Sequence, residues 1–190
     1  MSETNAIQIQ EVTKSFGKKV VLKDINFNIK EGSIYGFIGP SGSGKTTLIK
    51  IIVGMDVPDE GSIYLLGEKM PNLHILQQIG YMAQSDALYT TLTGKENLMF
   101  FASLFKLDKI EKQKRIAYAA ELVNLTADLD KRVSAYSGGM KRRLSLAIAL
   151  IQNPQVLILD EPTVGIDPEL RLSIWNELLR LKMKKAKRLL

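Results

Sequence analysis

The chain has 190 residues, 45% of them hydrophobic, and a mean hydropathy near zero, which suits one globular domain with a sizeable core. It has no cysteine, which excludes a disulfide framework and thiolate chemistry, and no apolar run approaches the roughly 18 residues of a membrane-spanning helix. The N-terminus lacks the basic and apolar regions of a signal peptide, so we expect a cytoplasmic protein.

The net charge of +6 is concentrated in the last residues of the chain. Without the five basic residues of this tail the chain is nearly neutral, so no nucleic-acid partner is expected. The tail is most simply a solvated helix end, where cations favour the helix dipole. Its basic residues are Lys182, Lys184, Lys185, Lys187 and Arg188.

The N-terminal part of the chain predicts short strands. Residues 6–12, 20–22 and 25–29 are β-prone, with a polar turn at residues 13–19, and the alternation of apolar and polar side chains indicates a half-exposed antiparallel sheet. Residues 34–38 are short, apolar and β-prone, which predicts a buried strand.

The next stretch fits the phosphate-loop pattern G-x-x-x-x-G-K-S/T, followed by a short predicted helix at residues 48–53. Glycines let backbone N–H groups approach a triphosphate closely, and the positive end of the helix favours anions. Lys45 would reach the β- and γ-phosphates, and the Thr46 hydroxyl would coordinate Mg²⁺. The expected nucleotide-binding residues are Gly39, Pro40, Ser41, Gly42, Ser43, Gly44, Lys45, Thr46 and Thr47.

The middle of the chain changes from strands to helices. Strands are predicted at residues 63–66 and 79–82, and a helix at 93–105, where Thr93 and Glu96 have the spacing of a capping box. A second helix is predicted from about 109 to 123. These helices interrupt an α/β pattern, so we expect an inserted helical subdomain at about residues 85–135.

Two further motifs follow. An apolar strand at residues 156–159 ends in Asp160 and Glu161; beside a phosphate loop, the first carboxylate would hold Mg²⁺ and the second could polarise the attacking water. Ser137, Gly138 and Gly139 precede a helix expected at residues 140–152, where a serine cap and two glycines leave N–H groups free for an anion. The basic residues that follow, Lys141, Arg142 and Arg143, are expected to be surface charges or partner contacts.

In combination, these motifs resemble the nucleotide-binding ATPase domain of ATP-binding cassette (ABC) transporters. Residues 136–140, Tyr-Ser-Gly-Gly-Met, resemble the cassette signature Leu-Ser-Gly-Gly-Gln, and the motifs occur in the family's order. The Tyr and Met variants, followed by Lys-Arg-Arg, are most similar to bacterial exporters of the multidrug, antibiotic or lipid type. The resemblance covers nearly the whole chain.

The resemblance implies an α/β fold: a phosphate-loop NTPase core with a mainly parallel sheet, an N-terminal antiparallel β-subdomain and the helical insertion, all in one domain of residues 1–190. Phe16 would stack on adenine. Gln84 would sense the γ-phosphate and Mg²⁺, and would join Glu161 and Lys45 as a catalytic residue. Asp167 would communicate across a dimer.

The resemblance also implies partners. Two cassettes, as a homodimer or a pair, would sandwich each ATP between one phosphate loop and the other copy's signature, so Ser137 and Gly139 would act in trans. Residues 85–93 match the region near transmembrane permease subunits. ATP and Mg²⁺ would be the cofactors, and the protein would be peripheral at the cytoplasmic face of the cell membrane.

The sequence departs from the family at its end. The family carries a further strand that ends in a histidine contacting the γ-phosphate, whereas this chain stops at Leu190 and its sole histidine, His74, precedes Gln84 and is expected at the surface. We therefore expect a truncated cassette with weak folding and little independent hydrolysis. Two alternatives stay open: a cassette that binds ATP without hydrolysing it, and a cassette that acts on ribosomes or DNA.

Overall fold

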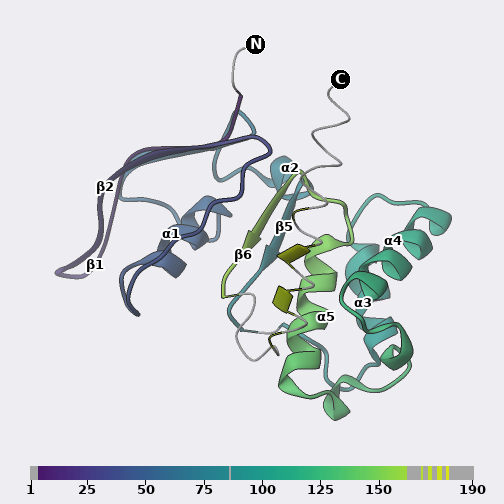
Figure 1. Ribbon diagram of the computed structural model, residues 1–190. Helices are drawn as coiled ribbons and strands as arrows, with labels where there is room; N and C mark the ends of the chain where they lie inside the picture. The colour runs from purple at the N-terminus through teal and green to yellow at the C-terminus, as the bar shows by residue number, and fades with distance from the viewer. Residues whose placement is uncertain are drawn as a thin grey trace. The chain divides into compact units, whose positions relative to one another are not determined.

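The computed structural model describes residues 4–85, 87–161, 168, 171–172, 175–176 and 179. The chain forms two compact units, Met1–Leu76 with Lys182–Leu190, and Gln77–Leu181 (Figure 1). Of the predicted final helix, six helical positions are described. Asp167 and the basic tail lie outside the described residues.

The first unit contains an antiparallel sheet with the strand order β2-β1-β3-β4. The long hairpin of β1 and β2 confirms the predicted half-exposed antiparallel sheet, since exposure alternates along β2. The strands are β1 (Asn5–Phe16), β2 (Lys19–Lys30), β3 (Glu60–Leu65) and β4 (Glu68–Lys69).

The first hairpin turn is shorter than the sequence predicts. The turn expected at residues 13–19 is limited to Gly17 and Lys18, because β1 stays paired with β2 as far as Phe16 and Lys19. Gly17 has a φ of 60°, a conformation that glycine adopts without strain and that a tight hairpin turn requires. The two strands predicted at 20–22 and 25–29 are likewise one irregular strand.

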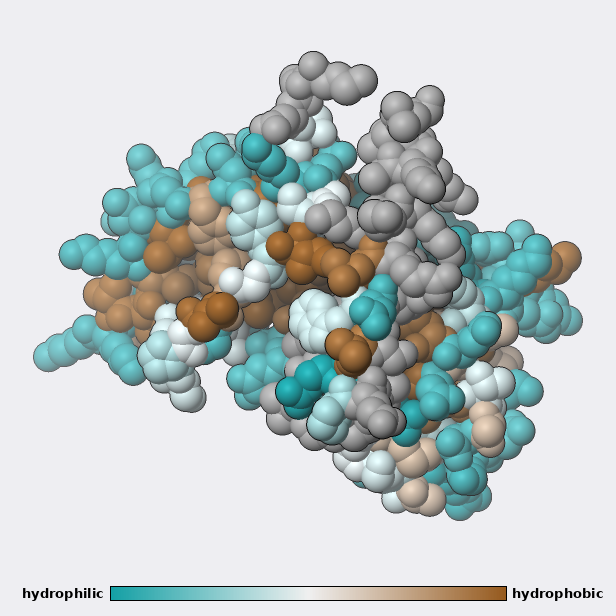
Figure 2. All heavy atoms as spheres, in the orientation of Figure 1, coloured by the Kyte–Doolittle hydropathy of each residue, from teal (hydrophilic) through white to brown (hydrophobic). Residues whose placement is uncertain are grey.

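Residues 34–38 do not form the predicted strand. Tyr35 is half exposed and Ile38 fully exposed, while Phe37 packs edge-on against Phe27 of β2 with ring centroids 5.5 Å apart. A strand forms where a neighbour completes its backbone hydrogen bonds, and within the described part of the chain no strand pairs with this segment. Apolar side chains therefore reach the surface on the side of this unit that carries the hairpin (Figure 2).

Helix α1 (Lys45–Ile52) follows the phosphate loop and begins three residues before the predicted start. One face of α1, made of Leu48, Ile49, Ile51 and Ile52, is buried, and the helix contacts β2 and β3. Gly54, at a φ of 74°, follows its last turn as predicted. The short helix α2 (Leu73–Leu76) carries His74, which is exposed.

The second unit is built on two parallel strands, β5 (Ile79–Met82) and β6 (Val156–Leu159), which pair in register from Ile79 and Val156 to Met82 and Leu159 (Figure 1). The sequence predicts a mainly parallel core sheet. Among the described strands, however, parallel pairing is limited to β5 and β6, because residues 34–38 remain unpaired. The parallel register brings the C-terminal ends of both strands to one edge.

Helices α3 (Gly94–Ser103), α4 (Lys109–Leu122) and α5 (Gly138–Leu150) pack around one apolar core, with the 3₁₀ turns η1 (Thr126–Asp128) and η2 (Val133–Ala135) between α4 and α5. The core's fully buried members are Leu98, Ala102, Ala119, Ala120, Val123, Leu125, Val133, Leu144, Leu146, Ala147 and Ile151. Both middle helices lie where the sequence predicts them, and the organisation as one domain with a helical insertion stays a prediction.

The start of α3 confirms the predicted capping box. The Thr93 hydroxyl accepts the Glu96 N–H (3.1 Å), and the Glu96 carboxylate accepts the Thr93 N–H (2.7 Å). These hydrogen bonds hold the pKa of Glu96 below its usual range. None of the helices in the described residues has the length and apolar character that a membrane crossing requires.

Candidate functional site

The phosphate loop, residues 39–47, adopts a backbone that its glycines permit. Gly42 and Gly44 have φ values of 78° and 91°, in the left-handed region. A Cβ at Gly44 would lie 2.9 Å from Leu22 Cδ2 and 3.0 Å from the Val21 carbonyl oxygen, so no larger residue fits there without a shift. Gly39, Pro40, Ser41, Gly42 and Ser43 are exposed, and Lys45, Thr46 and Thr47 are half-buried.

The N-terminus of α1 offers backbone donors to this loop. The helix begins directly after Gly44, whose carbonyl accepts its first hydrogen bond, from the Leu48 N–H (2.9 Å). The N–H groups of Lys45, Thr46 and Thr47 therefore precede the intrahelical ladder and face the open end of the helix. Gly44 caps the helix without a side chain, so these donors and the positive helix end suit an anion.

The Lys45 ammonium group closes the phosphate loop. Its Nζ donates hydrogen bonds to the carbonyl oxygens of Gly39 (2.7 Å) and Pro40 (2.8 Å) and lies 3.5 Å from Ser43 Oγ. An ammonium has three donors and can exchange partners easily. A phosphate oxygen would compete with these carbonyls for the same cation, so Lys45 is well placed to bind an anion in its own loop.

Phe16 stands at the end of β1 and is 53% exposed. An aromatic ring that is half uncovered can stack on a planar base. The ring is also covered on one side, because Lys14 Nζ lies 5.5 Å from its centroid, within the range of a cation–π contact.

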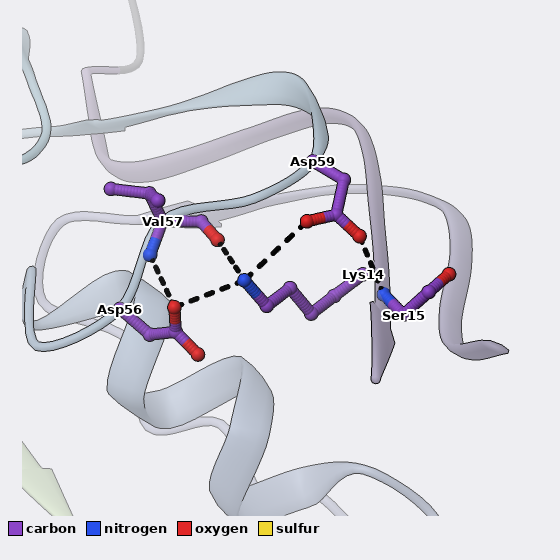
Figure 3. A network of polar contacts seen from close by, with 5 residues as sticks. All are labelled: Lys14, Ser15, Asp56, Val57 and Asp59. Atoms are coloured by element: carbon purple, nitrogen blue, oxygen red, sulfur yellow. Dashed lines mark hydrogen bonds and ion pairs between the residues drawn. The ribbon is translucent and has the colours of Figure 1, made fainter. Parts of the chain in front are cut away.

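Lys14 ties this strand end to the loop after α1 (Figure 3). The Nζ of this buried lysine donates to Asp56 Oδ1 (3.0 Å) and to the Val57 carbonyl (2.7 Å), and it lies 3.5 Å from Asp59. Asp59 also accepts the Ser15 N–H (2.7 Å). The hydrogen bond between Lys14 and Asp56 raises the pKa of the lysine and lowers that of the aspartate, so this anchor for Phe16 is an ion pair.

In the second unit, the strand ends bring two predicted catalytic residues together. Gln84 follows β5 and Glu161 follows β6, and Gln84 Nε2 donates to Glu161 Oε2 (3.1 Å) although the residues are 77 positions apart. The Asp160 N–H donates to the Met82 carbonyl (2.9 Å), which extends the ladder to the strand ends. Glu161 has a φ of 51°, in the left-handed region.

Asp160 is a buried carboxylate, 4% exposed, beside this pair. Its Oδ2 is buried and has no hydrogen-bond partner among the described residues. A buried carboxylate oxygen without a partner costs free energy unless a cation or a donor meets it, so Asp160 fits a role as a Mg²⁺ ligand. Burial, together with the Asp160 charge, raises the pKa of the nearby Tyr81 hydroxyl.

Arg142 is the functional residue that the sequence does not reveal. We expect a surface charge or a partner contact there, but the side chain is buried in α5, and its guanidinium reaches both strand ends. Nη1 donates to the carbonyls of Ala83 (2.7 Å) and Gln84 (3.0 Å). Nη2 donates to the carbonyls of Asp160 and Glu161, the latter at 2.6 Å. The prediction of an exposed charge is therefore wrong at this position.

Helical periodicity is the signal that could have found this residue. Arg142 shares a face of α5 with Leu146 and Ala149, four and seven positions further on, and both are buried. The next residue, Arg143, is also not a free surface charge, because its Nη1 donates to the Asn124 carbonyl (2.7 Å) at the end of α4. A cation there complements the helix dipole.

The N-terminus of α5 carries the serine cap that the sequence predicts. Ser137 Oγ accepts the Met140 N–H (3.2 Å), while Ser137 and Gly138 are exposed and Gly139 is half-buried. Tyr136 before the cap is buried and donates its hydroxyl to the Asp128 carbonyl (2.7 Å). The motif is thus anchored by its tyrosine and presents its serine and first glycine at the surface.

Residues 22–164 match the family model described as "ABC transporter". The chain belongs to the ABC transporter family. The match covers the phosphate loop, the strand ends and the signature at residues 136–140, whereas Phe16 and Asp167 lie outside it.

Two curated relatives are named as ATP-binding proteins. Nod factor export ATP-binding protein I of Sinorhizobium fredii is 43% identical over 93% of this chain and 52% of the relative. Linearmycin resistance ATP-binding protein LnrL of Bacillus subtilis is 41% identical over 92% of this chain and 57% of the relative. The chain thus spans little more than half the length of these relatives.

A solved ATP-binding cassette, described as a dimer in a post-hydrolysis state bound to ADP and Pi, is 30% identical to this chain. It matches with a TM-score of 0.85 over 94% of this chain and 84% of the solved chain. The chain therefore has the ABC cassette fold.

Proposed function

We propose that this chain is the ATP-binding and ATP-hydrolysing part of an ABC exporter. One observation carries the proposal: Gln84 and Glu161, far apart in sequence, share a hydrogen bond at the ends of two parallel strands, next to the buried Asp160. A glutamine, a general base and a cation ligand are the side chains that hydrolysis of a nucleoside triphosphate requires.

The phosphate loop would supply the binding energy. The N–H groups at the start of α1 would donate to phosphate oxygens, and Lys45 would exchange its loop carbonyls for the β- and γ-phosphates. Phe16 would stack on adenine, with Lys14 fixing its ring.

Glu161 would act as the general base. Its Oε2 accepts a hydrogen bond from Gln84 Nε2, which orients the carboxylate, and its Oε1 would accept a proton from the attacking water. Gln84 would also sense the γ-phosphate. The pair therefore positions the base before the nucleotide arrives.

Asp160 would hold Mg²⁺, with the Thr46 hydroxyl and the Gln84 side chain as further ligands. When bound, Mg²⁺ neutralises charge that develops on the phosphate oxygens. The Oδ2 of Asp160, which has no hydrogen-bond partner among the described residues, supports this assignment.

Transport would need partners. We propose a cassette dimer, in which Ser137, Gly138 and Gly139 contact the nucleotide of the other copy, and transmembrane permease subunits that hold the protein at the cytoplasmic face of the membrane. The dimer in the related solved structure and the word "export" in the name of one relative support this assignment.

The first test is thermal unfolding of the chain with and without Mg-ATP. Ligand at about 100 times its Kd stabilises a protein by about 2.7 kcal/mol, so we expect a clear rise in Tm for the wild type. Lys45→Ala should lose most of this rise because the loop then lacks its cation. Lys50→Ala is the matched control, since Lys50 lies exposed in the last turn of the same helix and should respond like the wild type.

Release of phosphate from ATP by the wild-type chain is the second measurement. A wild type whose Tm ignores Mg-ATP, or a Lys45→Ala variant that responds fully, would contradict nucleotide binding by this loop. Binding without any phosphate release would contradict hydrolysis and would favour the binding-only alternative.

A further inference from the structure

The ends of β5 and β6 are held by one side chain from a third element. The Arg142 guanidinium donates to four backbone carbonyls: two belong to Ala83 and Gln84 after β5, and two to Asp160 and Glu161 after β6. The residues that it fixes are those proposed to carry hydrolysis.

The backbone of Glu161 needs such support. Its φ of 51° lies in a region that residues with a Cβ rarely occupy, and such conformations persist where the surroundings impose them. Its carbonyl accepts from Arg142 Nη2 at 2.6 Å. This contact fixes the strained peptide and thereby the direction in which the Glu161 side chain leaves the backbone.

We propose that Arg142 is a positioning residue for ATP hydrolysis: it sets the Gln84–Glu161 pair in its productive geometry from within the signature helix. The inference rests on the proposed ATPase function. It adds a residue that contacts neither nucleotide nor metal and acts through two others.

The chemistry of the guanidinium explains why an arginine stands here. Its planar fork presents donors in fixed directions, so each Nη can serve the two carbonyls of one strand end. A lysine ammonium is a single compact donor group and cannot serve both strand ends in this geometry. Arg142→Lys therefore keeps the positive charge and removes the hydrogen bonds that join the two strand ends.

A purely stabilising role explains the arrangement less well. Taking a charge out of water is costly, and apolar residues of similar volume often stabilise a buried site equally or better. A buried arginine that donates to the strand-end carbonyls is better explained if the position of those carbonyls matters for hydrolysis.

Helix α5 carries both Arg142 and, at its N-terminus, the signature. Arg142 lies five positions after Ser137, within the first turns of α5. Because helix α5 also contacts β5 directly, a displacement of its N-terminus either moves the strand ends with it or breaks these hydrogen bonds. A ligand bound at the signature would therefore affect the position of Glu161 through Arg142.

The test compares Arg142→Lys with Arg143→Lys in the full chain. Arg143 is the matched control, since its guanidinium also binds backbone carbonyls, but those of Val123 and Asn124 at the end of α4. Misplacing a reacting group by about 1 Å can cost about 10²-fold in rate, so we expect a loss of this order in kcat for Arg142→Lys. The KM for ATP and the Mg-ATP shift in Tm should stay near wild type. Arg143→Lys should retain its kcat.

Amide hydrogen exchange without nucleotide is the second measurement, and it does not require activity. Arg142→Lys should speed exchange in peptides covering residues 80–85 and 157–161, and Arg143→Lys only near residues 123–125. Unchanged exchange at the strand ends, a wild-type kcat in Arg142→Lys, or equal losses of kcat, KM and Tm in both variants would overturn the proposal. A wild type that releases no phosphate would refute the proposed function instead, and the exchange result would then decide the role of Arg142 alone.

Discussion

The phosphate loop and the strand-end carboxylates are built in opposite ways. The loop is exposed, offers backbone N–H groups, and is closed by Lys45 on its own carbonyls. The carboxylate site offers side chains, of which Asp160 is buried, and it is held by Arg142 from helix α5. One site depends on local chain conformation, and the other on packing.

This difference explains what each site tolerates. Backbone donors need only the right φ and ψ values, which Gly42 and Gly44 supply by lacking a Cβ. Side-chain bases need their direction fixed by neighbours, so their performance depends on residues that never meet the substrate. Substitutions in the phosphate loop should therefore reduce nucleotide binding, whereas substitutions at the strand-end carboxylates should reduce turnover.

The largest expected effect is at Glu161. Glu161→Gln keeps the shape of the side chain and removes the base, so kcat should fall by about 10²- to 10⁴-fold while the Mg-ATP shift in Tm persists. Phosphate release and thermal unfolding measure the two quantities. Glu121→Gln, an exposed position on α4, should match the wild type in both. Loss of nucleotide binding in Glu161→Gln would contradict the assignment of binding to the phosphate loop and of turnover to the carboxylates.

The next largest expected effect is on the free energy of unfolding, and it differs between a packed and an exposed apolar residue. Leu98 is fully buried in the helical core and Ile38 is fully exposed beside the phosphate loop. Leu98→Ala should lower the free energy of unfolding by about 2–5 kcal/mol, whereas Ile38→Ala should change it by less than about 0.5 kcal/mol. Urea titration followed by circular dichroism measures both. A large effect of Ile38→Ala would show that residues 34–38 are packed in solution.

The smallest expected effect concerns the cap of α3. Thr93→Ala should cost about 1 kcal/mol, because the Glu96 N–H loses its acceptor. Since hydrogen bonds lower the pKa of Glu96 in the folded state, its contribution is complete above the usual glutamate pKa of about 4.3 and is lost as the pH falls through the lower folded value. Urea midpoints of wild type and Glu96→Gln should therefore converge on acidification. A gap that is constant with pH would contradict this role.

Elements whose signals are local could be predicted from the sequence. Thr93 and Glu96 mark the start of α3, and the apolar run at β6 (Val156–Leu159) ends in its acids as expected. The turn at Gly17 and the segment at residues 34–38 were harder, because pairing with a partner strand, rather than composition, decides where a strand begins and ends.

The candidate site divides in the same way. The phosphate loop is contiguous, so its spacing alone identifies it. Glu161 was expected from the apolar strand that precedes it and Gln84 from the family resemblance, and their hydrogen bond became visible only with β5 and β6 in register. Arg142 escaped because a basic residue near a helix start normally faces water, and only the tertiary packing of α5 buries it.

At Glu161 the proposed reaction requires a carboxylate, whereas the left-handed backbone conformation favours glycine. A residue with a Cβ in such a conformation costs about 1–3 kcal/mol, which glycine would largely avoid. Selection for stability alone would thus favour glycine where the proposed reaction needs a carboxylate. A sequence redesigned only to make this fold more stable would discard the side chain on which its proposed turnover depends.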